Sequence, residues 1–457
     1  MIRLIKRLLL SIFFIFPLYN LRAQDQSSSF TLKELLNRAV ASYPLIKSKG
    51  FEVKAAEEGV NATKRTLVPT LDASYQADYA TYNNIIGMAP PSSIYPISGP
   101  PSSGNNSSGV LGSSASLLLN WQPITFGQRS AQVDYSKAGF ARTSADARNE
   151  IFQHKVKVIG TYLNALASIE LVKVCEKNLS RAETNLKIIK SLVISGIKPG
   201  VDTAMYKAEI SRAKIELLNL RSYKEQTLIT LSQYVVTDQP IIVSDSTYFT
   251  KLPSVPLTMD SEEHPLLDLY SLNIEVTRAK LKMLNRTLLP TLGFWGTTYA
   301  RGSGIHYDGV SNSSDGLSFQ RYNYGVGVQI SLPVLQSVRI QPQLKQQEFL
   351  VKSDEEKLKD ISLQLKKQLE MADTDLGNAL AVAKENPFLV ESSEYSYKAV
   401  LSRYQSGLVN YSDLIQGQYL LLKAESDNKT AYVNAWKALL LKASVKGDLN
   451  LFLNQVN

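Results

Sequence analysis

The chain contains 457 residues, of which 44% are hydrophobic, 20% are charged and 9% are aromatic. This composition excludes a disordered chain and a collagen-like chain. The single cysteine, Cys175, excludes an intrachain disulfide and a cysteine-based zinc site. The three histidines lie far apart in the sequence and lack the spacing of metal ligands, so the sequence predicts no metal and no cofactor.

The first 23 residues have the pattern of a secretory signal peptide. A basic start, Met1–Arg7, precedes the short apolar run Leu8–Phe16, and Ala23 stands before the expected cleavage site. The apolar run is too short to span a membrane as a helix, and an ordinary amphipathic first helix is the alternative. No cysteine follows Ala23, so we expect no N-terminal lipid anchor at this site.

The mature chain carries a mild and dispersed positive charge. Removal of residues 1–23 takes away four basic residues and no acid, which lowers the formal charge from +9 to +5. Such a charge does not indicate nucleic-acid binding. No other stretch holds 18 consecutive apolar residues, so we expect no membrane-spanning helix, although strands could still enter a membrane.

The sequence repeats itself once. Residues Arg65–Leu71 read RTLVPTL and residues Arg286–Leu292 read RTLLPTL, at an offset of 221 positions. A Ser-Gly pair with an aspartate six residues after the glycine occurs at 195–202 and again at 406–413. This period is far longer than a solenoid unit and predicts the duplication of one large structural unit. The predicted organisation is a first repeat at 24–240, a joint at 241–260 and a second repeat at 261–457.

Each repeat reads as helix, strand, loop, strand, long helix and shorter helix. In the first repeat, Thr31 and Glu34 have the pattern of a capping box before an amphipathic stretch that Pro69 ends. Alternating apolar and polar residues then indicate two strands around a Pro- and Gly-rich loop. Heptad-spaced apolar residues indicate a long helix that stops at Gly196. The predicted elements are a helix at 32–67, strands at 70–81 and 114–122, a long helix at 127–195 and a helix at 201–236.

The second repeat predicts the same elements with two irregularities. In its first strand, Trp295 and Tyr299 fall on the face opposite to Leu292, so the alternation is incomplete. Pro387 lies within the second long helix and predicts a kink or a break there. The predicted elements are a helix at 263–288, strands at 291–301 and 322–332, a long helix at 337–406 and a helix at 412–446.

The four predicted strands are each about ten residues long, which fits a transmembrane β-barrel with an apolar lipid face and a polar lumen. Tyr79, Trp121 and Tyr322, near strand ends, would then lie at the membrane interface. A half-buried sheet of a soluble protein has the same pattern and is the alternative. Four strands cannot close a barrel, and an open edge cannot face lipid, so a membrane location requires several copies that each donate four strands.

The duplicated layout, the paired Leu-x-Pro-Thr-Leu strand entries and the paired Ser-Gly-x5-Asp turns resemble the TolC-like outer-membrane efflux proteins over residues 30–455. The resemblance implies a mainly α-helical fold with a membrane β-barrel portion. In it, a homotrimer in the lipid of a Gram-negative outer membrane forms a 12-stranded barrel above a long antiparallel α-helical barrel in the periplasm. A periplasmic adaptor, or membrane fusion protein, and an inner-membrane RND or ABC transporter are the implied partners.

The resemblance also implies a gate at the periplasmic entrance. Asp202 and Asp413 match acidic positions of the family, and Tyr404 matches a tyrosine that links neighbouring helices in the closed state. Two positions depart from the family pattern. Val409 stands where the family has a gate arginine, and the uncharged Gln416 stands where it has a second aspartate, so the salt bridges of the family gate are not expected here. An acid near the N-terminus of a helix is the alternative role for both aspartates.

The resemblance places the turns at Gly196 and Gly407 at the tips that contact the adaptor, and helix C-terminal capping is a compatible role for both glycines. The chain would then be a passive exit duct for small molecules or proteins in a tripartite efflux or type I secretion system. No nucleophile elbow, phosphate loop or HExxH motif occurs, so we expect no enzyme. A secreted structural or adhesive coiled-coil protein is the alternative, although it gives no reason for two amphipathic strand pairs.

Overall fold

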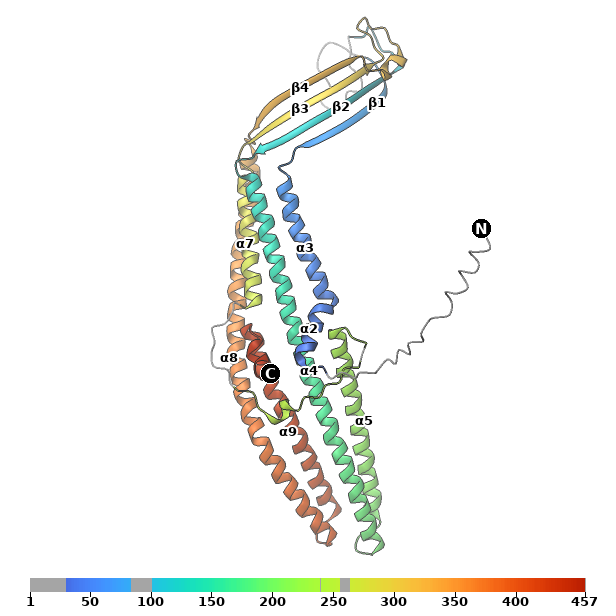
Figure 1. Cartoon of the computed structure of the whole chain (residues 1–457), viewed down its shortest axis with the longest axis vertical. Helices are drawn as coiled ribbons and strands as arrows, with labels where there is room; N and C mark the ends of the chain where they lie inside the picture. The colour runs from blue at the N-terminus through green and yellow to red at the C-terminus, as the bar shows by residue number, and fades with distance from the viewer. Residues whose placement is uncertain (1–29, 84–100, 239, 255–263, 457) are drawn as a thin grey trace, which may run out of the picture.

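A computed structural model describes residues 30–83, 101–238, 240–254 and 264–456. The predicted signal peptide at 1–23 and residues 255–260 of the predicted joint lie outside the described residues. The molecule is elongated, with a body of long helices between a four-stranded sheet at one end and the tips of two helical hairpins at the other (Figure 1).

Long helices and one antiparallel sheet make up the fold, which confirms the predicted fold class for the single chain. In chain order the elements are α2 (Leu32–Ser42), α3 (Pro44–Arg65), β1 (Thr70–Thr81), β2 (Gly109–Ile124), α4 (Gln128–Ile194), α5 (Val201–Val235), α6 (Thr247–Thr250), α7 (Pro265–Arg286), β3 (Thr291–Ser303), the 3-10 helix η1 (Ser313–Leu317), β4 (Arg321–Ser331), α8 (Gln336–Gln405), α9 (Tyr411–Lys446) and α10 (Asn450–Leu453). The succession α3, β1, β2, α4, α5 recurs as α7, β3, β4, α8, α9.

The helix predicted at 32–67 is two helices, α2 and α3, and the single-helix prediction is wrong. Tyr43 between them has an extended backbone, with φ −65° and ψ 124°. Proline disfavours the helical conformation of the residue before it, so Pro44 breaks the helix and begins the next one. The capping box at the start of α2 is present, because Thr31 N–H donates to Glu34 Oε2 at 2.9 Å and Glu34 N–H donates to Thr31 Oγ1 at 3.3 Å.

The strand predicted at 114–122 begins five residues earlier and ends two residues later, as β2. Gly109 pairs with Thr81, so backbone pairing with β1 continues to the first residue of β2. Glycine and serine have low intrinsic strand propensity, and they fill most of the early part of β2. The pairing partner, which the local sequence does not reveal, therefore sets the start of this strand.

The second long helix, α8, continues through Pro387 without the break that the sequence favours. Proline removes one backbone hydrogen bond and disturbs the preceding turn. Here the Asn386 side-chain Nδ2 donates to the Val382 carbonyl oxygen at 2.8 Å, which adds a bond across that turn. We infer that this side-chain bond helps to hold the helix together at the proline.

The strands form one antiparallel sheet in the order β1–β2–β3–β4, so β1 and β4 are its edges. The register collects apolar side chains from all strands on one face, which we call the apolar face, and polar side chains on the other, the polar face. One line of paired residues on the apolar face is Tyr75, Ala115, Ala300 and Tyr322. This face is open to the surroundings of the protomer, and Tyr324 on it is 90% exposed.

The polar face explains the irregular third strand. Trp295 points to this face and lies over β4, where an ideal Cβ on Gly327 would be 2.5 Å from the indole Cε2. A Cβ on Gly325 would be 3.3 Å from the same ring. The two glycines therefore provide the space in which the large indole lies flat on the sheet.

Replacing Gly327 with valine should destabilise the sheet, because the new side chain and the Trp295 ring cannot occupy the same space. We expect a loss of about 1–3 kcal/mol, the usual cost of overpacking. Thermal unfolding of the purified protein measures the loss. The double variant Gly327→Val, Trp295→Gly should recover part of it, and an equally unstable double variant would contradict the proposed packing.

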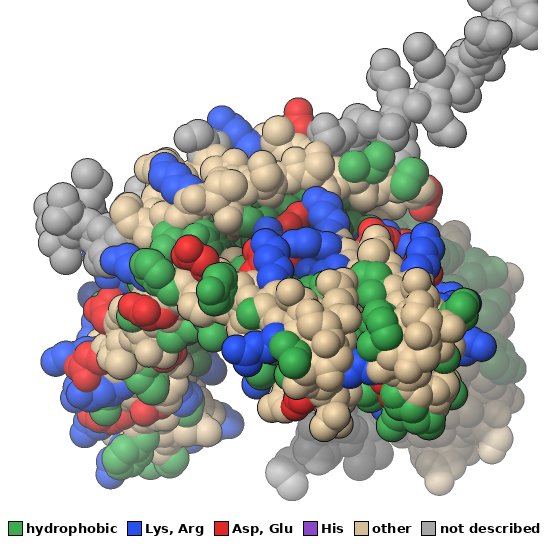
Figure 2. All heavy atoms as spheres, turned by 90° about the horizontal axis from the view of Figure 1, so that it is seen from below, with side chains coloured by type: hydrophobic (Ala, Val, Ile, Leu, Met, Phe, Trp, Pro, Cys, Tyr) green, Lys and Arg blue, Asp and Glu red, His purple; other side chains and the backbone are tan. Residues whose placement is uncertain are grey.

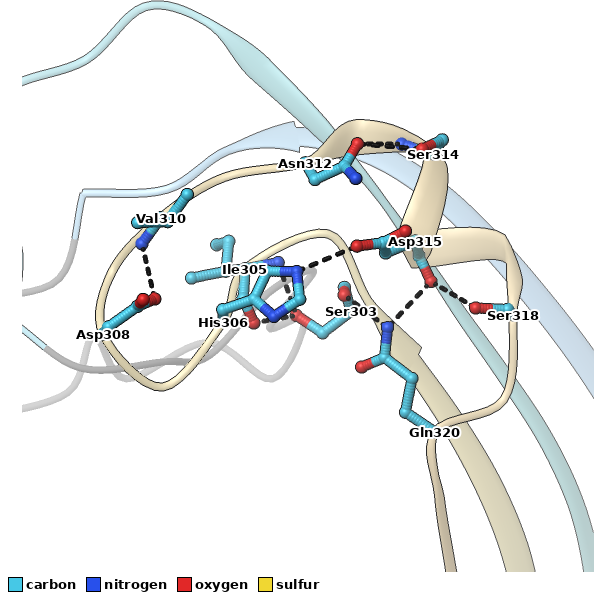
Figure 3. A network of polar contacts seen from close by, with 10 residues as sticks. All are labelled: Ser303, Ile305, His306, Asp308, Val310, Asn312, Ser314, Asp315, Ser318 and Gln320. Atoms are coloured by element: carbon cyan, nitrogen blue, oxygen red, sulfur yellow. Dashed lines mark hydrogen bonds and ion pairs between the residues drawn. The ribbon is translucent and has the colours of Figure 1, made fainter.

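The segment between β3 and β4 folds back over the outer end of the sheet. Ser113 Oγ of β2 donates to the Gly316 carbonyl oxygen at 2.6 Å. Within the segment, His306 Nε2 lies 2.8 Å from Asp315 Oδ2, and the Asp308 carboxylate accepts a backbone N–H (Figure 3). Both acidic side chains of this loop are therefore engaged inside it.

The main hydrophobic core lies midway along the helices, where α2, α4, α5 and α9 meet α10 and the segment around α6. Trp436 is 1% exposed and packs against the rings of Tyr248 and Phe452. Among the described residues, α4 alone is long and apolar enough to cross a membrane. An 18-residue window of it has a mean hydropathy of 1.4 and is 56% buried. A buried core helix has this composition too, and α4 contributes several fully buried residues to this core.

Candidate site at the tips of the helical hairpins

The tips of the two hairpins are tight turns that close on glycine. Gly196 after α4 has φ 72°, and Gly407 after α8 has φ 80°, a region that favours glycine. Ile197 N–H donates to the Leu192 carbonyl oxygen at 2.9 Å, and Leu408 N–H donates to the Arg403 carbonyl oxygen at 2.9 Å. Both turns therefore end their helices with the same capping geometry, and this geometry turns the chain back into α5 and α9.

Two of the predicted gate residues meet at these tips. The Tyr404 hydroxyl of α8 donates to Asp202 Oδ2 of α5 at 2.6 Å, and the two side chains are 0% and 6% exposed. Burial, followed by the hydrogen bond to the Asp202 carboxylate, raises the pKa of the Tyr404 hydroxyl. This bond connects the two hairpins to each other.

Lys198 adds a second connection between the same turns. Its Nζ donates to the Val409 carbonyl oxygen at 2.7 Å and lies 4.5 Å from the centre of the Tyr404 ring. Val409, which replaces the arginine expected at that position, therefore accepts a charged hydrogen bond through its backbone. A lysine on the opposite hairpin provides the positive charge at this junction.

The other two predicted gate residues lie on α9 and do not join this contact. Asp413 is exposed, and its Oδ2 accepts the Asn410 N–H at 3.1 Å, the alternative role of an acid at a helix start. Gln416 is exposed and lines a groove of 460 Å³ between α5 and α9. In the single chain, the four predicted residues therefore separate into a buried pair and two exposed side chains.

A buried polar network, which sequence reasoning missed, connects all four long helices near the tips. Asn185 Nδ2 of α4 donates to the hydroxyl oxygens of Tyr206 on α5 and Tyr397 on α8, at 2.8 and 2.7 Å. The Tyr206 hydroxyl donates to Gln418 Oε1 of α9, and Gln418 Nε2 donates to Asn178 Oδ1 at 3.2 Å. The heptad spacing of Asn178 and Asn185 beside an apolar seam was the one signal of it in the sequence.

A buried charge cluster lies further up the helices. Glu425 of α9 is 8% exposed and accepts bonds from Arg181 Nη1 and Nη2 at 2.9 and 2.6 Å, and from Lys177 Nζ at 2.8 Å. Burial alone would raise the pKa of Glu425, but the hydrogen bonds from Arg181 and Lys177 outweigh it and hold the pKa below its ordinary value. These bonds join α4 to α9, and thus the first hairpin to the second.

Several hydrophobic side chains are exposed at the tips. Figure 2 views the molecule from this end and shows hydrophobic side chains on the nearest lobes, with lysine and arginine around them. Ile194, Ile197 and Val201 on the first tip and Leu408 on the second are exposed, Ile194 to 87%. The described residues contain no group of three or more histidine, cysteine or acidic side chains that could hold a metal ion. The site therefore offers hydrogen bonds, charges and an apolar rim.

Comparisons with known proteins agree with this architecture. Residues 35–235 match the sequence model of the family described as outer membrane efflux protein. No curated protein sequence matches the chain.

Solved structures of outer-membrane channels have the same fold. The outer membrane protein VceC of Vibrio cholerae aligns with a TM-score of 0.71 at 14% identity, over 91% of this chain and 96% of its own. The CmeC outer membrane channel of Campylobacter jejuni aligns with a TM-score of 0.69 at 13% identity, over 91% of this chain and 85% of its own. The open state of the MtrE outer membrane channel of Neisseria gonorrhoeae aligns with a TM-score of 0.67 at 14% identity, over 91% of this chain and 89% of its own.

Proposed function

We propose, from the premise that this chain is a TolC-like outer-membrane efflux protein, that three copies assemble into one passive duct. We infer that it is an outer-membrane exit channel with a helical extension in the periplasm and not an enzyme, and the match of residues 35–235 to the efflux-protein family and the shared fold support this. The duct would serve a tripartite efflux or type I secretion system, and it would export small molecules or proteins that an inner-membrane RND or ABC transporter delivers.

The sheet carries this proposal. It has an apolar face, a polar face and two edge strands, β1 and β4. Among the described residues, the outward-facing backbone groups of these two strands have no neighbouring strand to pair with. Unpaired backbone groups cannot face lipid, and about eight strands are the observed minimum for a membrane barrel. A barrel of several chains satisfies both conditions, and three chains of four strands is the number that the resemblance implies. In it, the apolar face would lie toward lipid, Tyr79, Trp121 and Tyr322 at the interface, and the polar face toward the lumen.

The hairpin tips would form the periplasmic entrance. The Tyr404–Asp202 bond and the buried Asn185 network join the two hairpins of the protomer, and they would hold the entrance in its closed state. The exposed apolar residues at the tip turns around Gly196 and Gly407 suit docking of a periplasmic adaptor, because apolar patches at an otherwise polar end mark interaction sites. Opening would separate the hairpins without any chemical step in this chain.

Reconstitution in planar lipid bilayers tests the proposal. The duct should give stepwise conductance increments, and the purified protein should require detergent and migrate as a trimer. A protein that stays folded, soluble and monomeric without detergent would rule out the channel and favour the coiled-coil alternative.

Replacing Asp413 with asparagine should weaken the cation preference of the channel. Three exposed carboxylates at the entrance would give a local negative potential, whereas asparagine keeps an oxygen acceptor for the Asn410 N–H without the charge. The cation-to-anion permeability ratio, measured from the reversal potential in a salt gradient, should fall toward one. An unchanged ratio would remove Asp413 from the gate.

A further inference from the structure

The two free edges of the sheet carry opposite charges on the polar face. This observation matters only if copies of the chain close a barrel, so the inference rests on the proposed trimer. In that trimer β4 of one protomer lies beside β1 of the next, because these are the sheet's edges. The two strands run in opposite directions relative to the helices, since β1 leads away from α3 and β4 returns to α8 (Figure 1).

Arg321 is the first residue of β4, at the end of the strand away from the helices, and it pairs directly with Arg301 of β3. Both side chains belong to the polar face, in the same alternation as Trp295. Like charges directly opposite each other destabilise a sheet. Among the described residues, neither arginine has an acidic partner, and Arg321 Nη1 donates to the adjacent Gln320 carbonyl oxygen at 2.9 Å. An acidic group from outside the protomer would relieve this repulsion.

Few acids of the protomer can provide that group. The loop before β4 contains Asp308 and Asp315, and both are engaged inside the loop (Figure 3). The sequence from residue 79 to residue 128, which includes the whole β1–β2 connection, contains no charged residue. The remaining acids on the polar face are Asp72 and Asp78 of β1, on the opposite edge of the sheet.

The position along the strand selects Asp78. The helices of every protomer must lie on one side of a symmetric trimer, so the ends of β1 and β4 that lie away from the helices come together. Asp78 lies three residues before the end of β1, near that end, whereas Asp72 lies six residues, or about 20 Å, closer to the helices. Asp78 is half-buried and lacks an ion-pair partner in the described part of the chain.

Side-chain parity agrees with this choice. The apolar faces of neighbouring protomers must be continuous toward lipid, so Arg321 can only lie opposite an even-numbered residue of β1. Directly opposite and diagonal positions are both within reach of an arginine side chain. Asp78 is therefore accessible from Arg321 whether residue 76, 78 or 80 is the direct partner.

We propose that Arg321 of each protomer forms an ion pair with Asp78 of the neighbouring protomer, on the lumen side of the barrel near its outer mouth. Three such pairs limit the strand register at the junctions between protomers to those that bring Arg321 within reach of Asp78, and they give Arg321 a counter-charge. The partner of this surface is a second copy of the chain, and Asp78 is the residue that it supplies.

A charge swap in the full-length protein tests the pair. The temperature at which the detergent-solubilised trimer dissociates is followed by size-exclusion chromatography with light scattering. Arg321→Glu and Asp78→Lys should each lower this temperature by several degrees, and the double variant Arg321→Glu, Asp78→Lys should restore it. Arg301→Gln, which removes a like charge on β3 without adding an acid that could pair with Arg321, is the control and should not lower it. A double variant whose dissociation temperature falls by the sum of the two single effects would overturn the pair.

Cysteine pairs provide a second test that does not depend on stability. Asp78→Cys combined with Arg321→Cys should be linked between protomers by a short bismaleimide crosslinker, which spans direct and diagonal positions, and should give a covalent trimer on a denaturing gel, and the native Cys175 is buried. Asp72→Cys with Arg321→Cys should remain monomeric on the same gel. Equal crosslinking of both pairs, or crosslinking of the Asp72 pair alone, would overturn the register. An unmodified protein that is not trimeric would instead contradict the proposed function.

Discussion

Replacing Glu425 with alanine should lower the free energy of unfolding by about 3–5 kcal/mol, the usual cost of removing one partner from a buried ion pair. The change leaves the Arg181 guanidinium, whose side chain is 16% exposed, without its counter-charge. Lys177 is 63% exposed and can turn to water, so Arg181 carries most of the effect. Thermal or denaturant unfolding, followed by the circular dichroism of the helices, measures it.

The matched control is Glu356→Ala. Glu356 pairs with Lys359 on the surface of α8, and both side chains are more than 70% exposed. An exposed pair of this kind contributes about 0–1 kcal/mol. A loss at Glu425 as small as the loss at Glu356 would contradict the structural role of the buried cluster.

The same cluster predicts how stability changes with pH. The folded pKa of Glu425 lies below its unfolded value, because the bonds from Arg181 and Lys177 outweigh burial. Its contribution is therefore fully present above the unfolded pKa and is lost as pH falls through the folded pKa. The free energy of unfolding of the Glu425→Ala variant should therefore fall less than that of the unmodified protein as the pH is lowered through this range.

Replacing Tyr404 with phenylalanine should open the entrance. The variant keeps the ring under Lys198 but loses the hydrogen bond to Asp202, which leaves a buried carboxylate without its donor. A hydrogen bond to a charged group contributes about 1.5–3 kcal/mol. If the bond exists only in the closed state, its loss shifts the closed-to-open ratio by about 10- to 150-fold.

Single-channel recordings in planar bilayers measure the shift as a longer open time or a larger mean conductance. Tyr395→Phe is the matched control, because Tyr395 lies on the same helix and is 77% exposed. Asp202→Asn should act on the same bond, so its effect and that of Tyr404→Phe should not add. Tyr404→Phe channels that open no more than unmodified channels would exclude this bond from gating.

Local sequence patterns predict most of the fold, because the periodicity of apolar residues is a local property. The alternation from Leu71 to Tyr79 and the glycines at both tips each correspond to an element in the structure. The division of the first helix at Tyr43 is equally local, because Pro44 disfavours the helical conformation of the residue before it, and the expectation of one helix over 32–67 overlooks this signal. The start of β2 at Gly109 depends on pairing with Thr81 of β1, so the local sequence around Gly109 does not predict it.

The site was less accessible from the sequence. The resemblance identified Tyr404 and Asp202, and the structure brings them into contact across 202 positions of the chain. The Asn185 network and the Glu425 cluster join helices that lie more than 200 residues apart, so no local pattern could pair their members. Polar residues beside a heptad seam indicate that something buried and polar exists, but only the packing of four helices shows what it contacts.

Imaging of the purified, detergent-solubilised particle by electron cryo-microscopy tests the central claim most directly. The account predicts three copies of the chain around one axis, with a closed 12-stranded barrel in the detergent belt and β4 of each protomer paired with β1 of the next. A particle of a single chain, with its four strands folded into a separate sheet outside any detergent, would contradict it.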